Sequence, residues 1–409
     1  MTAPPEPLLD LVRGPGRHLW VGHHPPIEAD GLALFGCTNF RAAAGLHQQY
    51  AVVWCYEDPI TNLALDALPL ALDELIRFVG ATGRLVIRYD VGQGVLAVKN
   101  FFGRRVGLTS RILHEEVAGD LLTTVFEVGR ADVELYRPGA WTFGVLTQNT
   151  RKANVIAFLK SVRDRDPAGA HQIVICGPED PDYAFARPDY LPQTYHPTRA
   201  EISRKKNDIA RAATRPNLLL AHDRYRLADD FFTGFDQYGY DFDYVTVTQR
   251  FEDGEEFPGY CHLTERAFRL SPQRMSTDLN ALPGVPFLNG GLFVVKTHLL
   301  RAVPLNDLSF WNQAEDVELS TTLLQRGIPP RLNPYSTATT NVGRDHIRAF
   351  LPAHPVPPPA PPPMTPTRAV ARIGRAVKGR ARLVLAGLLT LIVLLQVAVL
   401  AAVLTRGGP

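Results

Sequence analysis

Two adjacent carboxylates, Glu315 and Asp316, follow a tract of glycine, apolar and aromatic residues. The tract opens with the Asn-Gly-Gly sequence of residues 289–291, continues as Leu-Phe-Val-Val, and reaches Trp311 shortly before Glu315. Glycines allow a ligand to come close to the backbone, and an aromatic ring offers a face for stacking. A positioned carboxylate can remove a proton from a hydroxyl group. The segment from 289 to 319 is therefore predicted to hold and deprotonate a substrate.

The two carboxylates are expected to differ in role. The sequence Asn312-Gln-Ala-Glu315 fits a capping box, in which Asn312 caps a helix and Glu315 at the third helical position reaches back. Asp316, in the first turn, would then point into the site as the base. The helix dipole favours an ionised carboxylate there, so we expect Asp316 to be deprotonated at neutral pH.

Polar clusters also follow three apolar, strand-like runs in the middle of the chain. The runs and their clusters are Thr142–Thr147 with Asn149, Gln172–Cys176 with Glu179 and Asp180, and Asn217–Ala221 with His222, Asp223 and Arg224. A helical pattern at Val155–Val162 separates the first two runs, and this spacing predicts a parallel sheet with a right-handed crossover. Open α/β sheets bind ligands beyond the carboxyl ends of their strands, where the two acids would lie.

The order Asn-Gly-Gly, then Trp-x-x-x-Glu-Asp-Val-Glu-Leu, resembles the acceptor side of a GT-A glycosyltransferase of the family 2 type. The resemblance covers residues 141–345 and implies an α/β fold with a Rossmann-like mixed sheet. It implies inverting transfer of a sugar from a nucleotide-diphosphate donor to a glycan, lipid-linked or protein acceptor. Asp316 would be the base, with Glu315 beside it. It assigns the acceptor to Asn289, Gly290, Gly291 and Trp311, and the donor to Thr147, Asn149, Glu179, Lys205, Lys206, His222, Asp223 and Arg224.

The donor side departs from the family pattern, which usually has two or three aspartates after this strand. The last aspartate commonly ligates Mg²⁺ or Mn²⁺ on the diphosphate, and such cations take oxygen ligands. This chain has the single Asp223, between His222 and Arg224. Two interpretations stay open: Asp223, helped by His346, binds a divalent cation, or Arg224 supplies the positive charge itself.

The first 140 residues resemble the later half of a class I methyltransferase sheet, from about residue 15 onward. The pattern is a strand at Ala51–Cys55, a helix within Ala64–Gly80, and a strand at Arg84–Asp90 after a glycine turn; Phe126–Val128 and Val133–Tyr136 would supply the antiparallel edge. A methyltransferase needs a glycine-rich loop after its first strand, but Leu19–Gly22 is followed by His-His-Pro-Pro. We expect a truncated module without a complete cofactor site and without S-adenosylmethionine.

The C-terminal end predicts a membrane anchor. Residues 383–404 carry no charge, and at ~1.5 Å per residue they extend about 33 Å, enough for a hydrocarbon core of roughly 30 Å. Residues 368–382 are basic, whereas only Arg406 follows the apolar run. The positive-inside rule then places the preceding chain in the cytoplasm, next to membrane lipids. The proline-rich residues 351–367 would form an extended spacer.

Length, net charge and cysteine content limit the possible domain number, partners and redox state. The chain has 409 residues and a formal net charge of +2, which suits two or three domains and gives no case for a nucleic-acid partner. Its four cysteines form no CxxC pair, so we expect reduced, mostly buried thiols. The expected domains are residues 1–140 and 141–350, followed by the spacer, the basic segment and the anchor. The rival interpretations are a non-catalytic scaffold on degenerate transferase domains, and an active methyltransferase.

Overall fold

The computed structural model describes residues 3–64, 67–131, 133–191, 194–196, 199–263, 275–276, 285–310 and 313–341. Residues 1–353 form one compact unit and residues 354–409 a second, and every helix and strand named here belongs to the first. Trp311, Asn312, His346, the spacer, the basic segment and the predicted anchor lie outside the described residues. Within the described residues, no helix is both long and apolar enough to cross a bilayer.

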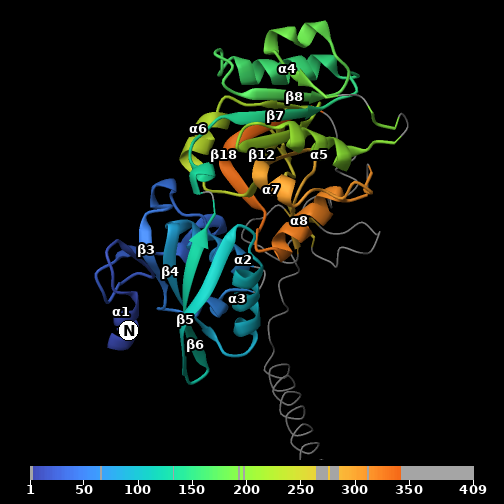
Figure 1. Ribbon diagram of the computed structural model, residues 1–409. Coiled ribbons are helices and arrows are strands. Elements are labelled where there is room, and N and C mark those ends of the chain that lie inside the picture. Colours follow the sequence, from blue (N-terminus) through green and yellow to red (C-terminus); the bar gives the residue numbers. More distant parts are fainter. Residues whose placement is uncertain are drawn as a thin grey trace, which may run out of the picture. The chain divides into compact units, whose positions relative to one another are not determined.

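The N-terminal part is built around one sheet flanked by helices (Figure 1). Its elements are α1 Glu6–Val12, β1 His18–Val21, β2 Asp30–Leu32, β3 Tyr50–Cys55, α2 Leu68–Phe78, β4 Val79–Asp90, α3 Gln93–Arg104, β5 Leu108–Ala118 and β6 Leu121–Arg130. The strands pair in the order β2-β1-β3-β4-β6-β5. Strands β1, β3 and β4 are parallel, β6 is antiparallel to β4, and β5 is antiparallel to β6.

The sequence predicted most of this sheet but not its outer strand. The strand at Ala51–Cys55, the following helix, and Phe126–Val128 in an antiparallel strand are confirmed. The prediction for Val133–Tyr136 is wrong, because these residues form a short 3-10 helix and the edge strand is β5. Strand β5 is mostly exposed and carries charged residues, so it lacks the apolar alternation that marks a strand in sequence.

Both faces of this sheet are packed. Helices α2 and α3 cover one face through a core that includes Leu72, Leu75, Phe78, Val53 and Leu85. On the opposite face, Leu8 and Val12 of α1 pack in a cluster with Trp20, Trp54 and Val86. Alternate side chains of one strand point to opposite faces, which is why Val53 and Trp54 enter different clusters.

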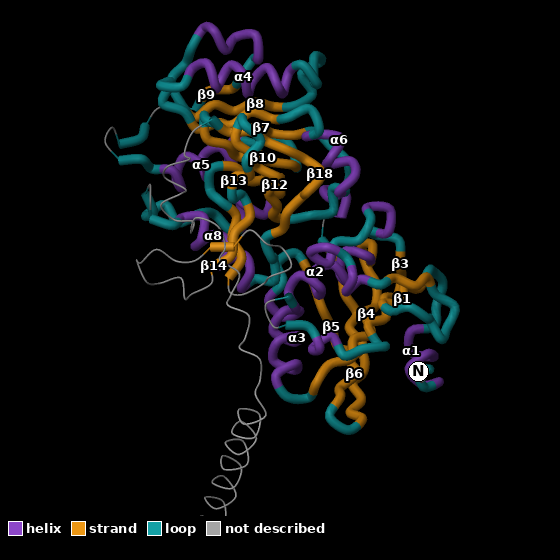
Figure 2. Tube along the Cα trace, turned by 180° about the vertical axis from the view of Figure 1, so that it is seen from behind, coloured by secondary structure: helices purple, strands orange, loops and turns teal. Residues whose placement is uncertain are grey.

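A second, larger sheet follows. Its region contains β7 Trp141–Leu146, α4 Lys152–Arg163, β8 Gln172–Cys176, β9 Asp189–Tyr190, α5 Ile202–Ala212, β10 Asn217–His222, β11 Tyr225–Leu227, α6 Phe231–Tyr238, β12 Tyr244–Phe251, β13 Glu256–Phe257, β14 Tyr260–Leu263, β15 Met275–Ser276, β16 Val285–Leu288, β17 Leu292–Lys296, α7 Thr297–Ala302, α8 Glu315–Gln325 and β18 Arg331–Thr340. Figure 2 shows the strands of the two large sheets as separate groups.

The larger sheet is mixed, as the sequence predicts. Its strand order is β11-β18-β12-β17-β10-β7-β8-β9, with β13 paired to β12. Strands β10, β7 and β8 are parallel, which confirms the predicted strand–helix–strand unit of β7, α4 and β8. Strand β17 lies between β10 and β12 and is antiparallel to both. Strands β14, β15 and β16 form a separate small sheet that leads into Asn289.

Alternation along the central strand β10 separates two apolar cores. Leu219 and Ala221 enter the core that contains side chains of α4 and α6. Leu218 and Leu220 enter the core that contains side chains of α5, α7 and α8. Helices therefore cover both faces of the sheet, and the loops at the carboxyl ends of its parallel strands are left to form a site.

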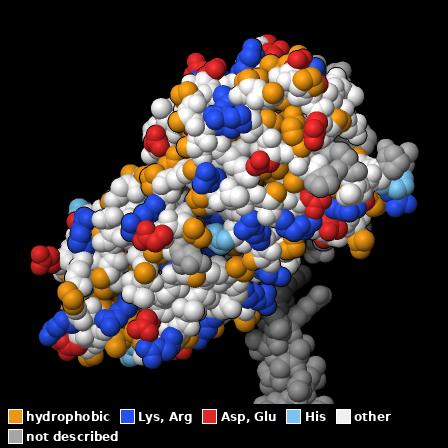
Figure 3. All heavy atoms as spheres, turned by 45° about the horizontal axis from the view of Figure 1, so that its top comes forward, with side chains coloured by type: hydrophobic (Ala, Val, Ile, Leu, Met, Phe, Trp, Pro, Cys, Tyr) orange, Lys and Arg blue, Asp and Glu red, His pale blue; other side chains and the backbone are white. Residues whose placement is uncertain are grey.

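Buried ion pairs join the two large sheets. The Arg77 guanidinium on α2 contacts Asp241 at 2.8 Å and Asp243 at 2.7 Å, just ahead of β12. Arg331 at the start of β18 contacts Glu74 on α2 at 3.2 Å. Buried charges are costly unless they are paired, so these contacts hold the sheets in one arrangement. On the face that Figure 3 shows, basic and acidic side chains are interspersed.

Candidate active site

Two of the predicted motifs meet at one edge of the larger sheet. Strands β10 and β17 are antiparallel neighbours, and Ala221 pairs with Leu292. The turn His222–Arg224 after β10 therefore faces the Asn-Gly-Gly turn that precedes β17. The backbone N–H of His222 donates to the carbonyl of Gly291 at 2.9 Å. The structure thus brings together two groups of residues that are more than 60 positions apart in the printed sequence.

Helix α8 begins at Glu315, two residues later than the capping box requires, so the predicted capping box is wrong. The N-cap residue is Ala314, with a φ of 57°, and among the described residues no side chain makes a capping hydrogen bond there. Glu315 is the first helical residue and not the third, so it cannot reach back in a capping box. Its carboxylate instead accepts from the buried Lys206 ammonium of α5 at 3.2 Å.

Asp316 lies against the glycine turn. Its Oδ2 accepts from the backbone N–H of Gly290 at 2.8 Å, and its Oδ1 accepts from the backbone N–H of Val317 at 2.9 Å. A Cβ atom on Gly290 would lie 2.9 Å from Glu315 Oε1 and 3.1 Å from Lys206 Nζ. It would also lie 3.1 Å from Asp316 Cβ, so the glycine leaves space for the base and for the Glu315–Lys206 pair beside the turn.

Burial raises the pKa of Asp316 to about 6, with a second contribution from the charge of Glu315. The hydrogen bond from Gly290 and the charge of Lys206 act in the opposite direction. The expected effect of the helix dipole is thus outweighed. A carboxyl with this pKa is still mostly ionised at pH 7, and it is a stronger base than an ordinary aspartate.

The other side of the site is a cavity of about 350 Å³. It is lined by Leu146, Thr147, Gln148, Thr150, Arg151, Ala200, Ile202, Lys205, His222 and Asp223. The buried carboxylate of Asp223 accepts from Thr147 Oγ1 at 3.0 Å and from Arg151 Nη1 at 2.9 Å. Arg151 was not assigned a role from the sequence, although it stands in the polar turn that was expected to face the donor.

Four basic side chains act on His222, a residue of the cavity lining. Burial, followed by the charges of Lys206, Arg224, Arg151 and Lys205, holds the pKa of His222 well below its usual range. The imidazole is therefore neutral. Arg151 is paired with Asp223 and Lys206 with Glu315, whereas no carboxylate of the described chain lies within 4 Å of Lys205 or Arg224. Two cations are thus left for an anionic ligand.

Arg224 is held between aromatic rings and the glycine turn. Its guanidinium lies 5.2 Å from the ring centres of both Tyr225 and Phe257. A Cβ atom on Gly291 would collide with Arg224 Nη2 and would lie 2.9 Å from the Tyr225 hydroxyl. Gly291 therefore gives the guanidinium room beside the turn.

Thr147 and Asn149 belong to the same edge of the sheet. Asn149 has a φ of 62°, and its backbone N–H donates to Thr147 Oγ1 at 2.9 Å. Its side-chain amide donates to Asp180 Oδ2 at 2.7 Å. The hydrogen bond from Lys152 lowers the pKa of Asp180 to about 2. Asp180 is thus built into the turn, whereas Glu179, the acid assigned to the donor, is exposed.

The donor set for a divalent cation is partial. Both carboxylate oxygens of Asp223 have partners, and the Nε2 atom of His222 is buried without one. Across the described ranges, no group of three His, Cys, Asp or Glu side chains is arranged to hold a metal ion. His346 and Trp311, which were assigned to the metal and the acceptor, lie outside the described residues.

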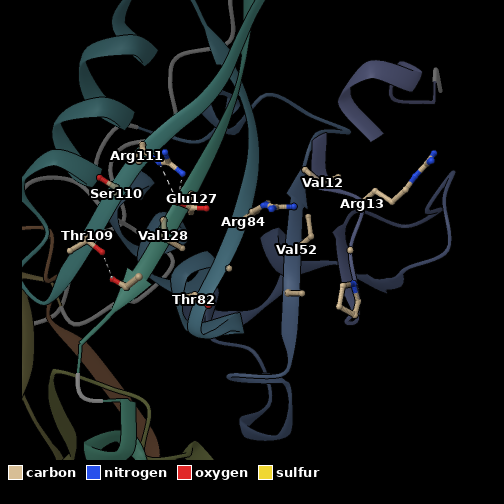
Figure 4. A pocket seen from close by; sticks show the side chains of 15 residues that line it. Val12, Arg13, Val52, Thr82, Arg84, Thr109, Ser110, Arg111, Glu127 and Val128 are labelled. Atoms are coloured by element: carbon tan, nitrogen blue, oxygen red, sulfur yellow. Dashed lines mark hydrogen bonds and ion pairs between the residues drawn. The ribbon is translucent and has the colours of Figure 1, made fainter. Parts of the chain in front are cut away.

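A different hollow, of about 680 Å³, lies on the N-terminal sheet (Figure 4). Arg84 and Arg111 border it, and Arg111 donates to Glu127 at 2.8 Å. It lies over the first residues of β4 and not at the carboxyl ends of the parallel strands. At one of those ends, a Cβ atom on Gly22 would collide with the Glu57 carboxylate, which accepts from the Trp20 indole at 3.1 Å. The Glu57 carboxylate therefore packs directly against the backbone that follows β1.

No protein-family model matches the chain, and no curated protein matches it. Among solved structures, it is similar to GalNAc-T7 with UDP, GalNAc and Mn²⁺: 13% identity over 50% of this chain and 44% of that chain, with a TM-score of 0.37. It is similar to a Pyrobaculum calidifontis mannosyltransferase with GDP-Man and Mn²⁺: 16% identity over 51% of this chain and 58% of that chain, with a TM-score of 0.36. S. aureus TarS, residues 1–349, gives 12% identity over 51% of this chain and 63% of that chain, with a TM-score of 0.32.

The chain spans less than two thirds of each of these neighbours. The neighbours are glycosyltransferases, but the identities and TM-scores are low.

Proposed function

We propose that residues 141–350 form a GT-A glycosyltransferase domain of the family 2 type, which transfers a sugar from a nucleotide-diphosphate donor to an acceptor hydroxyl. One observation carries the proposal. Asp316, with its pKa raised to about 6, accepts a hydrogen bond from the Gly290 N–H. The same glycine turn contacts the basic turn His222–Arg224. A base and an anion-binding surface on two sides of one backbone turn are what this transfer requires.

In the proposed reaction, the acceptor hydroxyl gives its proton to Asp316 as its oxygen bonds to the anomeric carbon. The bond from that carbon to the diphosphate oxygen breaks, and the electron pair leaves with the nucleotide. Lys205 and Arg224 stabilise the charge that develops on the diphosphate. A single displacement inverts the anomeric centre. The Asn289–Gly291 turn, with Trp311, would hold the acceptor in line.

A divalent cation remains part of the proposal in one of its two forms. Asp223 and the unpaired Nε2 of His222, together with His346, would hold Mg²⁺ or Mn²⁺, which would neutralise charge on the diphosphate. In the other form, the diphosphate is bound by Arg224 and Lys205 alone. The partial set of metal ligands supports binding of the diphosphate without a metal ion. The buried His222 Nε2, which has no hydrogen-bond partner, supports binding with a metal ion.

The remaining parts of the chain are assigned from sequence and topology. Residues 383–404 would anchor the enzyme as a single-pass protein with its catalytic part in the cytoplasm, where a lipid-linked acceptor is within reach. The N-terminal sheet would be a truncated methyltransferase-like module. Its parallel strands β2, β1, β3 and β4, followed by the antiparallel β6, support that interpretation, and Glu57 at Gly22 opposes binding of S-adenosylmethionine there.

The test is a screen of UDP- and GDP-sugars for donor hydrolysis and transfer, followed by Asp316→Asn. Loss of the base should lower the transfer rate by about 10²–10⁴-fold, while calorimetry shows unchanged donor affinity. Glu318→Gln is the matched control, because Glu318 is an exposed carboxylate on the same helix. Substantial turnover by Asp316→Asn would remove the assignment of the base.

Two further measurements test the metal-dependent form of the proposal and the scaffold interpretation. If EDTA leaves both donor binding and transfer unchanged, the metal form of the proposal is wrong. If calorimetry detects no heat with any UDP- or GDP-sugar, the chain is a scaffold. The pairing of Asp223 with Arg151, which occupies the one aspartate of this turn, is the observation that favours a scaffold.

A further inference from the structure

The loop Arg326–Pro330, which joins helix α8 to strand β18, and Arg331 at the start of β18 are held by the N-terminal sheet and its helices. Helix α8 carries Asp316 at its other end. The backbone N–H of Val106, ahead of β5, donates to the carbonyl of Arg326 at 3.2 Å. The end of the base-bearing helix therefore contacts a part of the chain that has no residue in the cavity beside Asp223.

The end of the helix is shaped for this contact. Gly327 has a φ of 72°, and the N–H of Ile328 donates to the carbonyl of Leu323 at 2.9 Å, so the helix stops at a glycine cap. A Cβ atom on Gly327 would lie 2.9 Å from Arg105 Cδ and 3.1 Å from Arg105 Cα. Arg105 thus packs directly on the cap.

Arg105 is itself fixed by charge. Its Nη2 atom donates to Asp73 at 2.9 Å and to Asp243 at 2.5 Å, and its side chain is buried. Four residues beyond the cap, Arg331 donates to Asp73 at 3.0 Å and to the carbonyl of Leu70 at 2.8 Å. The loop is therefore clamped at both of its ends by α2 and the residue that follows α3.

The body of α8 is rigidly packed between its two ends. Leu319 and Leu323 are buried in the core beneath the sheet. Ser320 Oγ is hydrogen-bonded to the Tyr244 hydroxyl at 3.1 Å and accepts from the Leu288 N–H at 3.2 Å. Eleven helical residues extend about 16 Å. We therefore expect the helix to respond to a change at its cap as one body.

We propose that the N-terminal sheet serves the transfer reaction as a positioning element, and that Arg105 sets where helix α8 presents Asp316 to the Gly290 turn. This inference rests on the proposed function. In this proposal the N-terminal module has a role that needs no cofactor, because it holds the catalytic base Asp316 of the neighbouring domain in position. Arg105 is a positioning residue, because it touches the end of the helix and none of the reacting groups.

The pH profile reports the position of Asp316 directly. The charged groups that face it are Glu315 on its own helix and Lys206 on α5, with the neutral Tyr244 and Cys261 nearby. The bond from Gly290 lowers its pKa. If the helix shifts and that bond lengthens, the pKa of Asp316 rises. The decline of the transfer rate at acid pH, here called the acid limb, then moves to higher pH.

The experiment compares Arg105→Met with Arg130→Met in the full chain, using the donor found in the screen. Arg130 is a matched control: it is a buried arginine of the same interface and donates to Asp241 at 2.7 Å, but it contacts no residue of 326–331 among its hydrogen bonds. Both changes should lower Tm. Only Arg105→Met should reduce kcat, by up to about 10²-fold, at unchanged KM for the donor, and move the acid limb upward.

Equal kcat and acid limbs in the two variants, or equal losses in both, would overturn the positioning role. Arg105→Lys keeps the charge and the aliphatic stem beside Gly327 but loses the guanidinium that bonds Asp73 and Asp243 and fixes that stem. It should therefore show a kcat loss and limb shift in the same direction if the Met variant does not fold. An inactive wild-type chain would refute the proposed function. An active wild-type chain with indistinguishable variants would refute only this inference.

Discussion

Glu315→Gln should move the acid limb of the transfer reaction to lower pH, and Lys206→Met should move it to higher pH. The charge of Glu315 raises the pKa of Asp316, and the charge of Lys206 lowers it. Glu315 and Lys206 are bonded to each other at 3.2 Å, so either change also frees the partner. Freed from Glu315, the ammonium stabilises ionised Asp316 more strongly, and freed from Lys206, the Glu315 carboxylate opposes ionisation more strongly. Both secondary effects reinforce the primary shifts.

The magnitude follows from the raised pKa. A value of about 6 stands roughly two units above an ordinary aspartate, which corresponds to about 3 kcal/mol between the protonation states. A single nearby charge typically moves a carboxyl pKa by about one unit or more, and a change of one unit is taken for each variant. At pH 6 the wild-type base is about half ionised, and a one-unit shift makes it about 90% ionised in Glu315→Gln and about 10% in Lys206→Met.

The assay is the initial transfer rate at saturating donor between pH 4.5 and 8.5. Glu318→Gln serves as the control, because Glu318 lies on the exposed side of the same helix and should leave the limb in place. Limbs that move in the same direction in both variants, or an acid limb that remains when Asp316 is replaced by Asn, would refute the assignment of the limb to Asp316.

Two other outcomes follow from the packing. Gly291→Ala should weaken donor binding more than it lowers Tm, because the new methyl group displaces the Arg224 guanidinium, and titration calorimetry with UDP and GDP measures this. Asp243→Asn should cost up to about 3–5 kcal/mol in urea unfolding at pH 7, since Arg77 and Arg105 keep Asp73 but lose the carboxylate that both contact. Interactions with Arg105 and Arg77 hold the pKa of Asp243 well below its usual range against the cost of burial. The stability from this carboxylate is present above its unfolded pKa of about 3.9 and is lost as pH falls below it, so the difference between wild type and Asp243→Asn should shrink at pH 3.

Local patterns predicted the elements that carry the site. The apolar runs that became β7, β8, β10 and β17 were legible because buried strands of a mixed sheet are continuously hydrophobic. The helix that opens at Glu315 was legible from its acidic first turn. The antiparallel pairing of β10 with β17 places the His222–Arg224 segment beside the Asn289–Gly291 turn, and the sequence had not predicted this pairing.

The sequence did not predict the ion pairs between side chains that are far apart in the chain. Arg151 and Asp223 are 72 positions apart, and Lys206 and Glu315 are 109 apart. No local pattern marks these pairs. The capping box failed because Ala314 takes a left-handed conformation, which starts the helix at Glu315 and leaves that side chain free to meet Lys206. Similarly, β5 was missed because an exposed edge strand has little apolar alternation.

The clamp on Arg331 has a consequence for the order in which the protein is made. Asp73 and Glu74 leave the ribosome about 260 residues before the arginine that pairs with them, on the order of ten seconds or more at the usual rates of synthesis. Until then Asp73 and Glu74 have only the partners that the N-terminal part supplies, which include Arg77 and Arg105 for Asp73 and Arg41 for Glu74. We expect chains stalled before Arg331 to show α2 open to protease, and chains stalled well beyond β18 to show it protected.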